Sequence, residues 1–225
     1  MFNNYEEVMD FCRAKEIKMI DFKVIDLTGR WRHLSIPIAR FTPDTLKFGI
    51  GFDGSNYGFA PVENSDMVFI PDISTTVCDP FTEVPTLSMI CDVFVIAQPE
   101  NYHFDQYPRN IAKRAEEFLK TSGIADEIRV GPEYEFHVFD HISYECLPHR
   151  MSLEIDAEQA HWNSGDNKYH NQGYKIPVKG GYHIAPPQDI LYDLRARMCV
   201  LLESNNIPVK YHHHEVGGPG QIEIE

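Results

Sequence analysis

Alternating apolar and polar residues predict the strands in the N-terminal part of the chain. Residues 18–27 alternate in this way, Thr28-Gly29 supplies a turn and residues 30–36 return, which predicts a β-hairpin. The β-forming residues of 67–70 and 86–96 predict two further strands. We expect these strands to form one small mixed sheet.

Helical spacing of apolar residues predicts four helices, over residues 5–15, between Thr42 and Gly49, over 108–120 and over 189–205. Asparagine or threonine caps, prolines in first turns and glycines after last turns support several of these ends. The last helix is expected to bury one apolar stripe, made of Ile190, Leu194, Met198, Leu201 and Leu202.

Two strand-forming stretches lie in the C-terminal part. Residues 128–139 predict a strand that is interrupted near Gly131-Pro132. Residues 211–216 and 221–225 flank a Gly/Pro turn and predict a hairpin. Residues 141–180 have little periodicity, so we expect a long loop there that carries function or is mobile.

Composition narrows the class of protein. The chain has 225 residues, which suffices for one large domain or two modest ones, and it ends in a predicted strand, so we expect the front part of a longer protein. A net charge of −14 argues against nucleic-acid binding. The five cysteines are scattered and contain no CxxC pair, which favours reduced thiols in the cytoplasm. The sequence has no apolar run of membrane-spanning length and no signal-like N-terminus, so we expect a cytoplasmic protein that does not bind membranes.

The candidate chemistry is a group of carboxylates. Glu133 and Glu135 alternate with apolar residues, so they share a strand face, roughly 7 Å apart. Glu223 lies on the predicted hairpin, and if that hairpin joins the same sheet, four or more carboxylates converge. Such a group needs a hard divalent cation, Mg²⁺ or Mn²⁺. The alternative is a solvated strand face without an ion.

A zinc hydrolase that uses His212 or His214 with Glu215 is a second possibility from the residues alone. It is disfavoured because adjacent residues point to opposite faces of a strand and the chain contains no HExxH motif.

Several short motifs, taken in order, resemble type I glutamine synthetase. They are Phe52-Asp53-Gly54-Ser55-Asn56, Gly131-Pro132-Glu133-Tyr134-Glu135-Phe136, Lys179-Gly180-Gly181-Tyr182, and His213-His214-Glu215-Val216 followed by Gly220-Gln221. The resemblance implies an α+β fold: a β-grasp domain over 1–104, then the first part of a catalytic α/β domain with an antiparallel sheet over 105–225.

The same resemblance implies ATP-dependent ligation of ammonia to L-glutamate through γ-glutamyl phosphate, with two Mg²⁺ or Mn²⁺ ions per complete site. It also implies a homo-oligomer of two stacked six-membered rings. The alternatives are a γ-glutamyl-amine ligase of the same family and a non-catalytic structural or binding member. Because family sites form between subunits, we expect this chain alone to be inactive.

The resemblance also implies roles for individual residues. Glu135, Glu215 and Glu223 match three ligands of the metal on the glutamate side, so Glu135 also belongs to the substrate site. Glu133 matches the first ligand of the nucleotide-side metal. Asp53 matches an aspartate that reaches from the N-terminal domain into the neighbouring subunit's site, where it helps to bind ammonium and to take its proton.

The remaining candidate positions are His213, His214 and Lys210. His213 and His214 are expected to lie behind the metal ligands rather than to bind the metal. Lys210 stands where the family commonly has an acidic residue that contacts the nucleotide. A lysine there could meet a phosphate or ribose only as a donor, or it could point to solvent.

Overall fold

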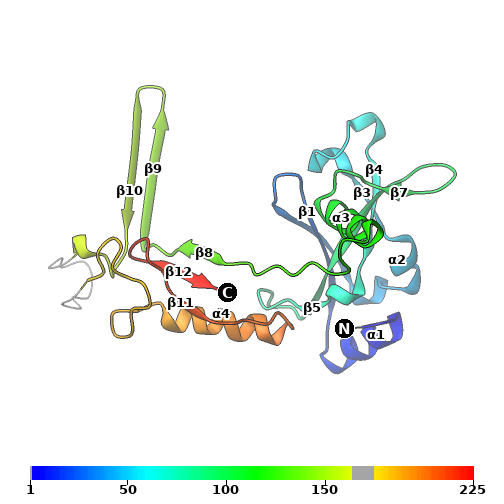
Figure 1. Cartoon of the computed structure of the whole chain (residues 1–225). Coiled ribbons are helices and arrows are strands. Elements are labelled where there is room, and N and C mark those ends of the chain that lie inside the picture. Colours follow the sequence, from blue (N-terminus) through cyan, green and yellow to red (C-terminus); the bar gives the residue numbers. More distant parts are fainter. Residues whose placement is uncertain (1, 164–174) are drawn as a thin grey trace. The chain divides into compact units, whose positions relative to one another are not determined.

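The computed structural model describes residues 2–163 and 175–225, and the chain divides into two compact units, Met1–Arg129 and Val130–Glu225. Figure 1 shows the elements of each unit. None of the helices in these ranges is both long and apolar enough to cross a membrane.

The first unit is built on a mixed sheet with the strand order β2-β1-β6-β4-β3, in which β1 and β6 are parallel and the other neighbours antiparallel. Two short strands, β5 and β7, also pair with β6. The bounds are β1 Met19–Ile25, β2 Trp31–Pro37, β3 Ile50–Asp53, β4 Asp66–Pro71, β5 Val77–Cys78, β6 Thr86–Val95 and β7 Tyr102–His103. The predicted hairpin and both predicted strands are therefore confirmed.

Helices and short turns of 3₁₀ helix complete this unit. Asn4 caps α1 (Tyr5–Ala14) by accepting a hydrogen bond from the backbone of Glu7, and α2 covers Pro43–Phe48. The 3₁₀ turns are η1 Ile38–Arg40, η2 Gly54–Tyr57, η3 Val62–Asn64 and η4 Ile73–Thr75. The core is apolar and includes Val8, Phe22, Phe41, Phe69, Leu87 and Met89.

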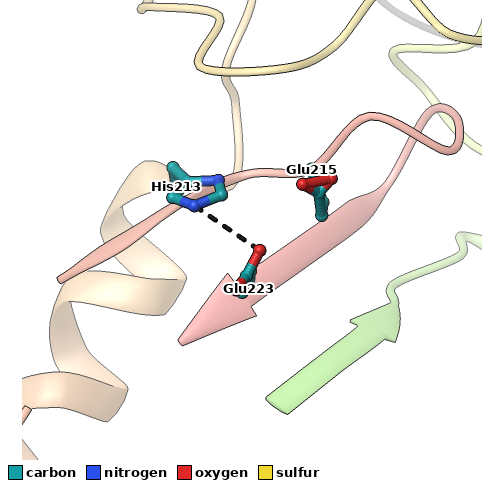
Figure 2. A group of neighbouring side chains, drawn as sticks. All are labelled: His213, Glu215 and Glu223. Atoms are coloured by element: carbon teal, nitrogen blue, oxygen red, sulfur yellow. Dashed lines mark ion pairs between the residues drawn. The ribbon is translucent and has the colours of Figure 1, made fainter. Parts of the chain in front are cut away.

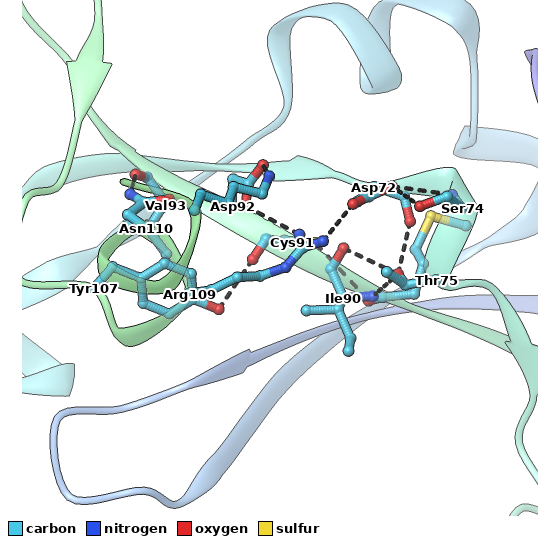
Figure 3. A network of polar contacts seen from close by, with 12 residues as sticks. Asp72, Ser74, Thr75, Ile90, Cys91, Asp92, Val93, Tyr107, Arg109 and Asn110 are labelled. Atoms are coloured by element: carbon cyan, nitrogen blue, oxygen red, sulfur yellow. Dashed lines mark hydrogen bonds and ion pairs between the residues drawn. The ribbon is translucent and has the colours of Figure 1, made fainter. Parts of the chain in front are cut away.

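The helix α3 (Pro108–Ser122) is anchored to β6 by polar contacts. Tyr107, just before the helix, donates from its hydroxyl to Cys91 O at 3.0 Å. The guanidinium of Arg109 lies between the carboxylates of Asp72 and Asp92, as Figure 3 shows. The first compact unit ends at Arg129 and therefore includes α3. The predicted domain boundary near residue 104 stays a prediction.

In the second unit, a three-stranded antiparallel sheet has the order β11-β12-β8. Its strands are β8 Tyr134–His137, β11 His212–His214 and β12 Gln221–Ile224. The predicted C-terminal hairpin is confirmed, while the strand expected over 128–139 is shorter than predicted and begins after Glu133. Ile222 and Ile224 are buried, and α4 (Tyr192–Ser204) packs against β11 and β12 (Figure 1).

The prediction of a loop over residues 141–180 is wrong for the first part of this range. The strands β9 (His141–Leu147) and β10 (Arg150–Asp156) form an antiparallel hairpin there, with Tyr144 opposite Leu153. A short 3₁₀ turn, η5 (His161–Asn163), follows. The part of the expected loop over 164–174 lies outside the described residues.

The prediction of a buried apolar stripe on the last helix is also wrong in part. The helix begins at Tyr192 rather than near Asp189, and the residue that it buries is Arg195. Ile190 and Leu194 are 37% and 40% exposed. Arg195 can be buried because the carboxylate of Asp189 accepts hydrogen bonds from both terminal nitrogens of its guanidinium.

Candidate functional site

The sheet register places three titratable side chains in one row. On β12, Glu223 is the direct partner of Glu135 on β8 and of His213 on β11. Directly opposed residues on one face of an antiparallel sheet have Cβ atoms about 4.5–5.5 Å apart. Pairing alone therefore brings together residues that lie far apart in the sequence.

Two overlapping groups of ligand atoms result. His213, Glu215 and Glu223 form the first group, and Figure 2 shows their side chains turned toward one another from β11, its end and β12. Glu133, Glu135 and Glu223 form the second. In each group the ligand atoms all lie within 4.8 Å of one another, and Glu223 belongs to both.

Glu223 is the electrostatic centre of the site. Glu223 is 7% exposed, and burial raises the pKa of its carboxyl. His213 acts against this shift, while the charges of Glu135, Glu215 and Glu133 add to it. The ion-pair contact of Glu223 within the described residues is His213 Nε2, at 3.5 Å from Oε2. A buried carboxylate among other carboxylates is stabilised by a cation between them.

The residues around the acids fix their geometry. Gln221 donates from Nε2 to Glu135 Oε2 at 2.8 Å and accepts at Oε1 from the backbone amide of Gly217. Glu215 accepts from the amide of Val216. Sequence reasoning assigned no role to Gln221, although it opens the alternating stretch that led to Glu223.

The two predicted histidines have different surroundings. His213 Nδ1 lies 3.1 Å from His214 O, while its Nε2 faces Glu223. His214 is fully buried, with Nδ1 2.8 Å from Glu215 O and Nε2 3.0 Å from the side-chain amide of Gln159. Burial lowers the pKa of His214. Only His213 reaches the group of acids, and the role of each in metal binding stays a prediction.

Asp53 lies in the first unit, as the N-cap of η2. Its carboxylate accepts from the backbone amide and the hydroxyl of Ser55 at 2.9 and 2.7 Å and from Asn56 Nδ2 at 3.0 Å. The hydroxyl hydrogen bond is the largest cause that lowers the pKa of Asp53. This is the local turn that the sequence allowed as an alternative, and the role in ammonium binding stays a prediction.

Lys210 is paired within its own unit. Its Nζ lies 3.2 Å from each carboxylate oxygen of Glu225 and 4.6 Å from the ring centroid of Tyr211. The hydrogen bond with Glu225 raises the pKa of Lys210. Contact with a nucleotide stays a prediction.

A buried ion pair supports the site from the opposite side of β11. Asp189 and Arg195 are 4% and 1% exposed, and Arg195 Nε donates to His212 Nδ1 at 3.2 Å. Sequence analysis missed this pair because a charged residue inside an amphipathic helix is normally assigned to the solvent side.

The donor set fits a divalent cation. Four carboxylates supply the oxygen ligands that Mg²⁺ and Mn²⁺ prefer, and His213 adds one nitrogen. The fit rests on Glu223, which is buried and belongs to both groups. Glu135 and Glu215 accept hydrogen bonds from Gln221 and Val216. Among the described residues, no lysine or arginine forms an ion pair with Glu223.

Fold and site together define an α+β protein with an acidic, metal-type centre on an antiparallel sheet. The glutamine synthetase β-grasp domain model matches residues 16–96, and the glutamine synthetase catalytic domain model matches residues 105–225. The chain belongs to the glutamine synthetase family.

Individual relatives carry more than one name. A glutamine synthetase of Pseudomonas aeruginosa is 43% identical over 213 residues, 93% of this chain and 45% of its own length. A 3-hydroxylaminophenol mutase of Cupriavidus pinatubonensis is 40% identical over 226 residues, 100% of this chain and 48% of its own. The chain thus spans about half the length of the curated relatives that it matches.

Solved structures show the same fold. A Plasmodium falciparum glutamine synthetase matches 99% of this chain and 44% of its own, with a TM-score of 0.84 and 26% identity. An apo form of GmaS matches 98% of this chain with a TM-score of 0.65 and 17% identity, a likeness of fold alone.

Proposed function

We propose that this chain is part of an enzyme that ligates ammonia to L-glutamate at the expense of ATP, through γ-glutamyl phosphate. The observation that carries the proposal is the row of Glu135, Glu223 and His213 across β8, β12 and β11, with Glu215 at its end. Family membership gives the row its chemical meaning.

In this proposal Glu135, Glu215 and Glu223 hold the metal on the glutamate side, and Glu133 is the first ligand of the nucleotide-side metal. Bound Mg²⁺ or Mn²⁺ would neutralise the charge that develops on the transferred phosphoryl group. The protein's own part is to present converging carboxylates and to hold Glu135 through Gln221.

Two further residues have proposed roles. Asp53 acts at the site of a neighbouring subunit, where it helps to bind ammonium and takes its proton, and the hydrogen bonds that hold its carboxylate in the turn keep it ionised. Lys210 donates a hydrogen bond to a phosphate or ribose of the nucleotide, and its ion pair with Glu225 breaks when it does so.

The assembly is proposed as two stacked six-membered rings in the cytoplasm, with a β-grasp domain over 1–104 and catalytic residues over 105–225. The proposal includes no nucleic-acid or membrane partner, in keeping with the net charge of −14. The chain of 225 residues alone is expected to be inactive.

A different reaction of the same family is the second candidate, and a γ-glutamyl-amine ligase is the one that the sequence analysis names. It is favoured by one observation: a relative named 3-hydroxylaminophenol mutase is as similar, at 40%, as several named glutamine synthetases. Comparing products from ammonia with those from alkylamines separates the two ligases, and absence of turnover with any of them leaves a structural or binding member.

The test uses the complete protein. Phosphate release should require glutamate and ammonia together, and γ-glutamyl hydroxamate should form with hydroxylamine. Glu223→Gln should lower turnover by at least about 100-fold, the upper range for changing a residue that only supports a ligand. Exposed Glu154→Gln on β10 is the matched control and should leave turnover unchanged. Equal turnover of both variants would contradict the proposal.

A further inference from the structure

A pocket of about 270 Å³ opens at one end of the sheet in the first unit. Its floor is a row of direct strand partners, Met67 of β4, Val95 of β6 and Tyr102 of β7, whose side chains share one face of the sheet. Met67 and Val95 are buried, while Tyr102 is 52% exposed. The row therefore gives the pocket an apolar floor with an accessible aromatic ring at its edge.

Aromatic rings also form one wall of this pocket. Phe59 lies just after η2 and is 6% exposed, and its ring centroid lies 5.0 Å from that of Phe104. Ala60 and Pro61 continue the wall. The floor and the wall together are mainly apolar and aromatic, which is the usual lining of a site for a small organic ligand.

The rim of the pocket is polar, and its three side chains, Asn64, Asp105 and Gln106, each offer an oxygen acceptor. Among the described residues of the lining, Asp105 alone is charged. Its Oδ1 lies 3.2 Å from Nη1 of Arg114, in an exposed ion pair of the kind that contributes little. Within the described ranges, the side-chain amides of Asn64 and Gln106 have no hydrogen-bond partner. The rim thus holds acceptors that a ligand can use.

Hydrogen bonds within the unit hold the segment that carries Asp105 and Gln106. The carbonyl oxygen of Phe104 accepts from the backbone amide of Tyr107 at 3.1 Å and from Nδ2 of Asn110 at 3.0 Å. Asn110 is 3% exposed and lies in the first turn of α3, so it ties the segment to the body of the unit. A rim that is already ordered loses little conformational freedom when a ligand binds.

The rim is complementary to one chemical group. A primary ammonium group has three N–H donors, no acceptor and one positive charge. The rim offers three acceptor side chains and one negative charge, and the aromatic faces of the floor and the wall also attract cations. A ligand that carries a carboxylate would meet Asp105 with a like charge.

We propose that this pocket binds a small aromatic primary amine in its ammonium form. The apolar body of the ligand packs between the floor and Phe59, and its ammonium group donates to Asn64, Asp105 and Gln106. The described lining residues all belong to the first unit, and none of them belongs to the two groups of metal ligands. The inference therefore goes beyond the proposed function, and either can fail without the other.

The test is a titration of the chain of 225 residues with phenethylamine, followed by NMR. The ¹³C methyl resonance of Met67 and the backbone amide resonances of Asn64, Tyr102 and Gln106 should shift together at millimolar concentrations. The neutral analogue 2-phenylethanol should bind about tenfold more weakly, because hydrogen bonds to charged groups are stronger. The anion 3-phenylpropionate should leave these resonances unchanged.

Two variants test the rim and the floor separately. Asp105→Asn keeps the shape of the side chain and removes its charge, so it should weaken phenethylamine about tenfold and leave 2-phenylethanol unchanged. Tyr102→Ala removes the accessible ring and should weaken both ligands. Asp126→Asn and Tyr144→Ala, at exposed positions outside the lining, are the matched controls and should change neither affinity. Circular dichroism checks the folding of each variant.

Every other outcome overturns the inference. If phenethylamine shifts none of the four resonances at millimolar concentrations, the pocket is not a site for such amines. If 2-phenylethanol binds equally well, or if Asp105→Asn keeps the wild-type affinity, the pocket does not select an ammonium group. None of these results touches the metal site, which binding of Mn²⁺ tests separately.

Discussion

Glu223 of β12 and Glu135 of β8 are direct partners in an antiparallel pair, so two like charges face each other in the sheet. Directly opposed like charges destabilise a sheet. Gln221 relieves part of this by donating to Glu135, while Glu223 remains 7% exposed with its pKa raised. The strands therefore hold a charge arrangement that a bound cation would stabilise.

Glu223→Gln should stabilise the chain in the absence of divalent ions. Removing one of two opposed charges gains about 1 kcal/mol at most, or roughly 2–4 °C in melting temperature for a chain of this size. Mn²⁺ should raise the melting temperature of the wild type by mass action but not that of the variant. Thermal unfolding with and without Mn²⁺ measures both effects, and Glu154→Gln should behave as wild type.

Asp26 should make the N-terminal unit sensitive to acid. The Thr28 hydroxyl, the Arg30 amide and Arg32 hold the pKa of Asp26 well below its ordinary value. A lowered folded-state pKa stabilises the fold fully above the unfolded value, about 3.9, and this contribution is lost as the pH falls through the folded-state pKa.

Asp26→Asn should accordingly melt at a lower temperature than the wild type at neutral pH, and the difference should shrink below about pH 4. Melting curves across this range are the measurement, with exposed Glu63→Gln as the control. A difference that stays constant with pH would mean that the carboxylate charge is not what stabilises the turn.

The buried pair Asp189–Arg195 should be costly to break. Asp189→Asn leaves the guanidinium of Arg195, 1% exposed, without its charge partner, and loss of one partner of a buried pair costs about 3–5 kcal/mol. Urea unfolding followed by circular dichroism gives the value. Arg197→Met, on the exposed side of α4, is the control, and a loss below about 1 kcal/mol for Asp189→Asn would place the pair with surface salt bridges.

Gly181→Ala should move the turn that contains it away from β11. Its Cβ would approach the ring of His214 to 2.4 Å and Glu215 O to 2.9 Å, so we expect a loss of about 1–3 kcal/mol. Nothing lies within 4 Å of a Cβ on Gly218, so Gly218→Ala should change little. Melting temperatures of the two variants measure the contrast, and equal values would show that the turn adapts freely.

The elements that could be predicted from the sequence are those whose signals are local. The hairpin of β1 and β2 follows from strict alternation around Thr28-Gly29, and β12 follows from the alternation that makes Ile222 and Ile224 buried. The same alternation predicts that Glu223 lies on the opposite strand face from Ile222 and Ile224, where Glu133 and Glu135 were expected to join it.

Other features depend on contacts that no local pattern carries. The low periodicity of residues 141–180 predicts a loop where the hairpin of β9 and β10 lies. Apolar residues of this hairpin are exposed, among them Tyr144 at 80%, so its strands carry no buried face that a pattern could reveal. Arg195 is buried because its partner Asp189 precedes the helix. The approach of His183 to His213 depends on a turn that packs against a strand.

The most direct test of the central claim is the anomalous difference map of crystals of the chain grown with Mn²⁺. The account predicts a peak between the carboxylates of Glu135, Glu215 and Glu223, with the strands paired as described. A map that shows these side chains apart, with manganese bound elsewhere or not at all, would contradict it.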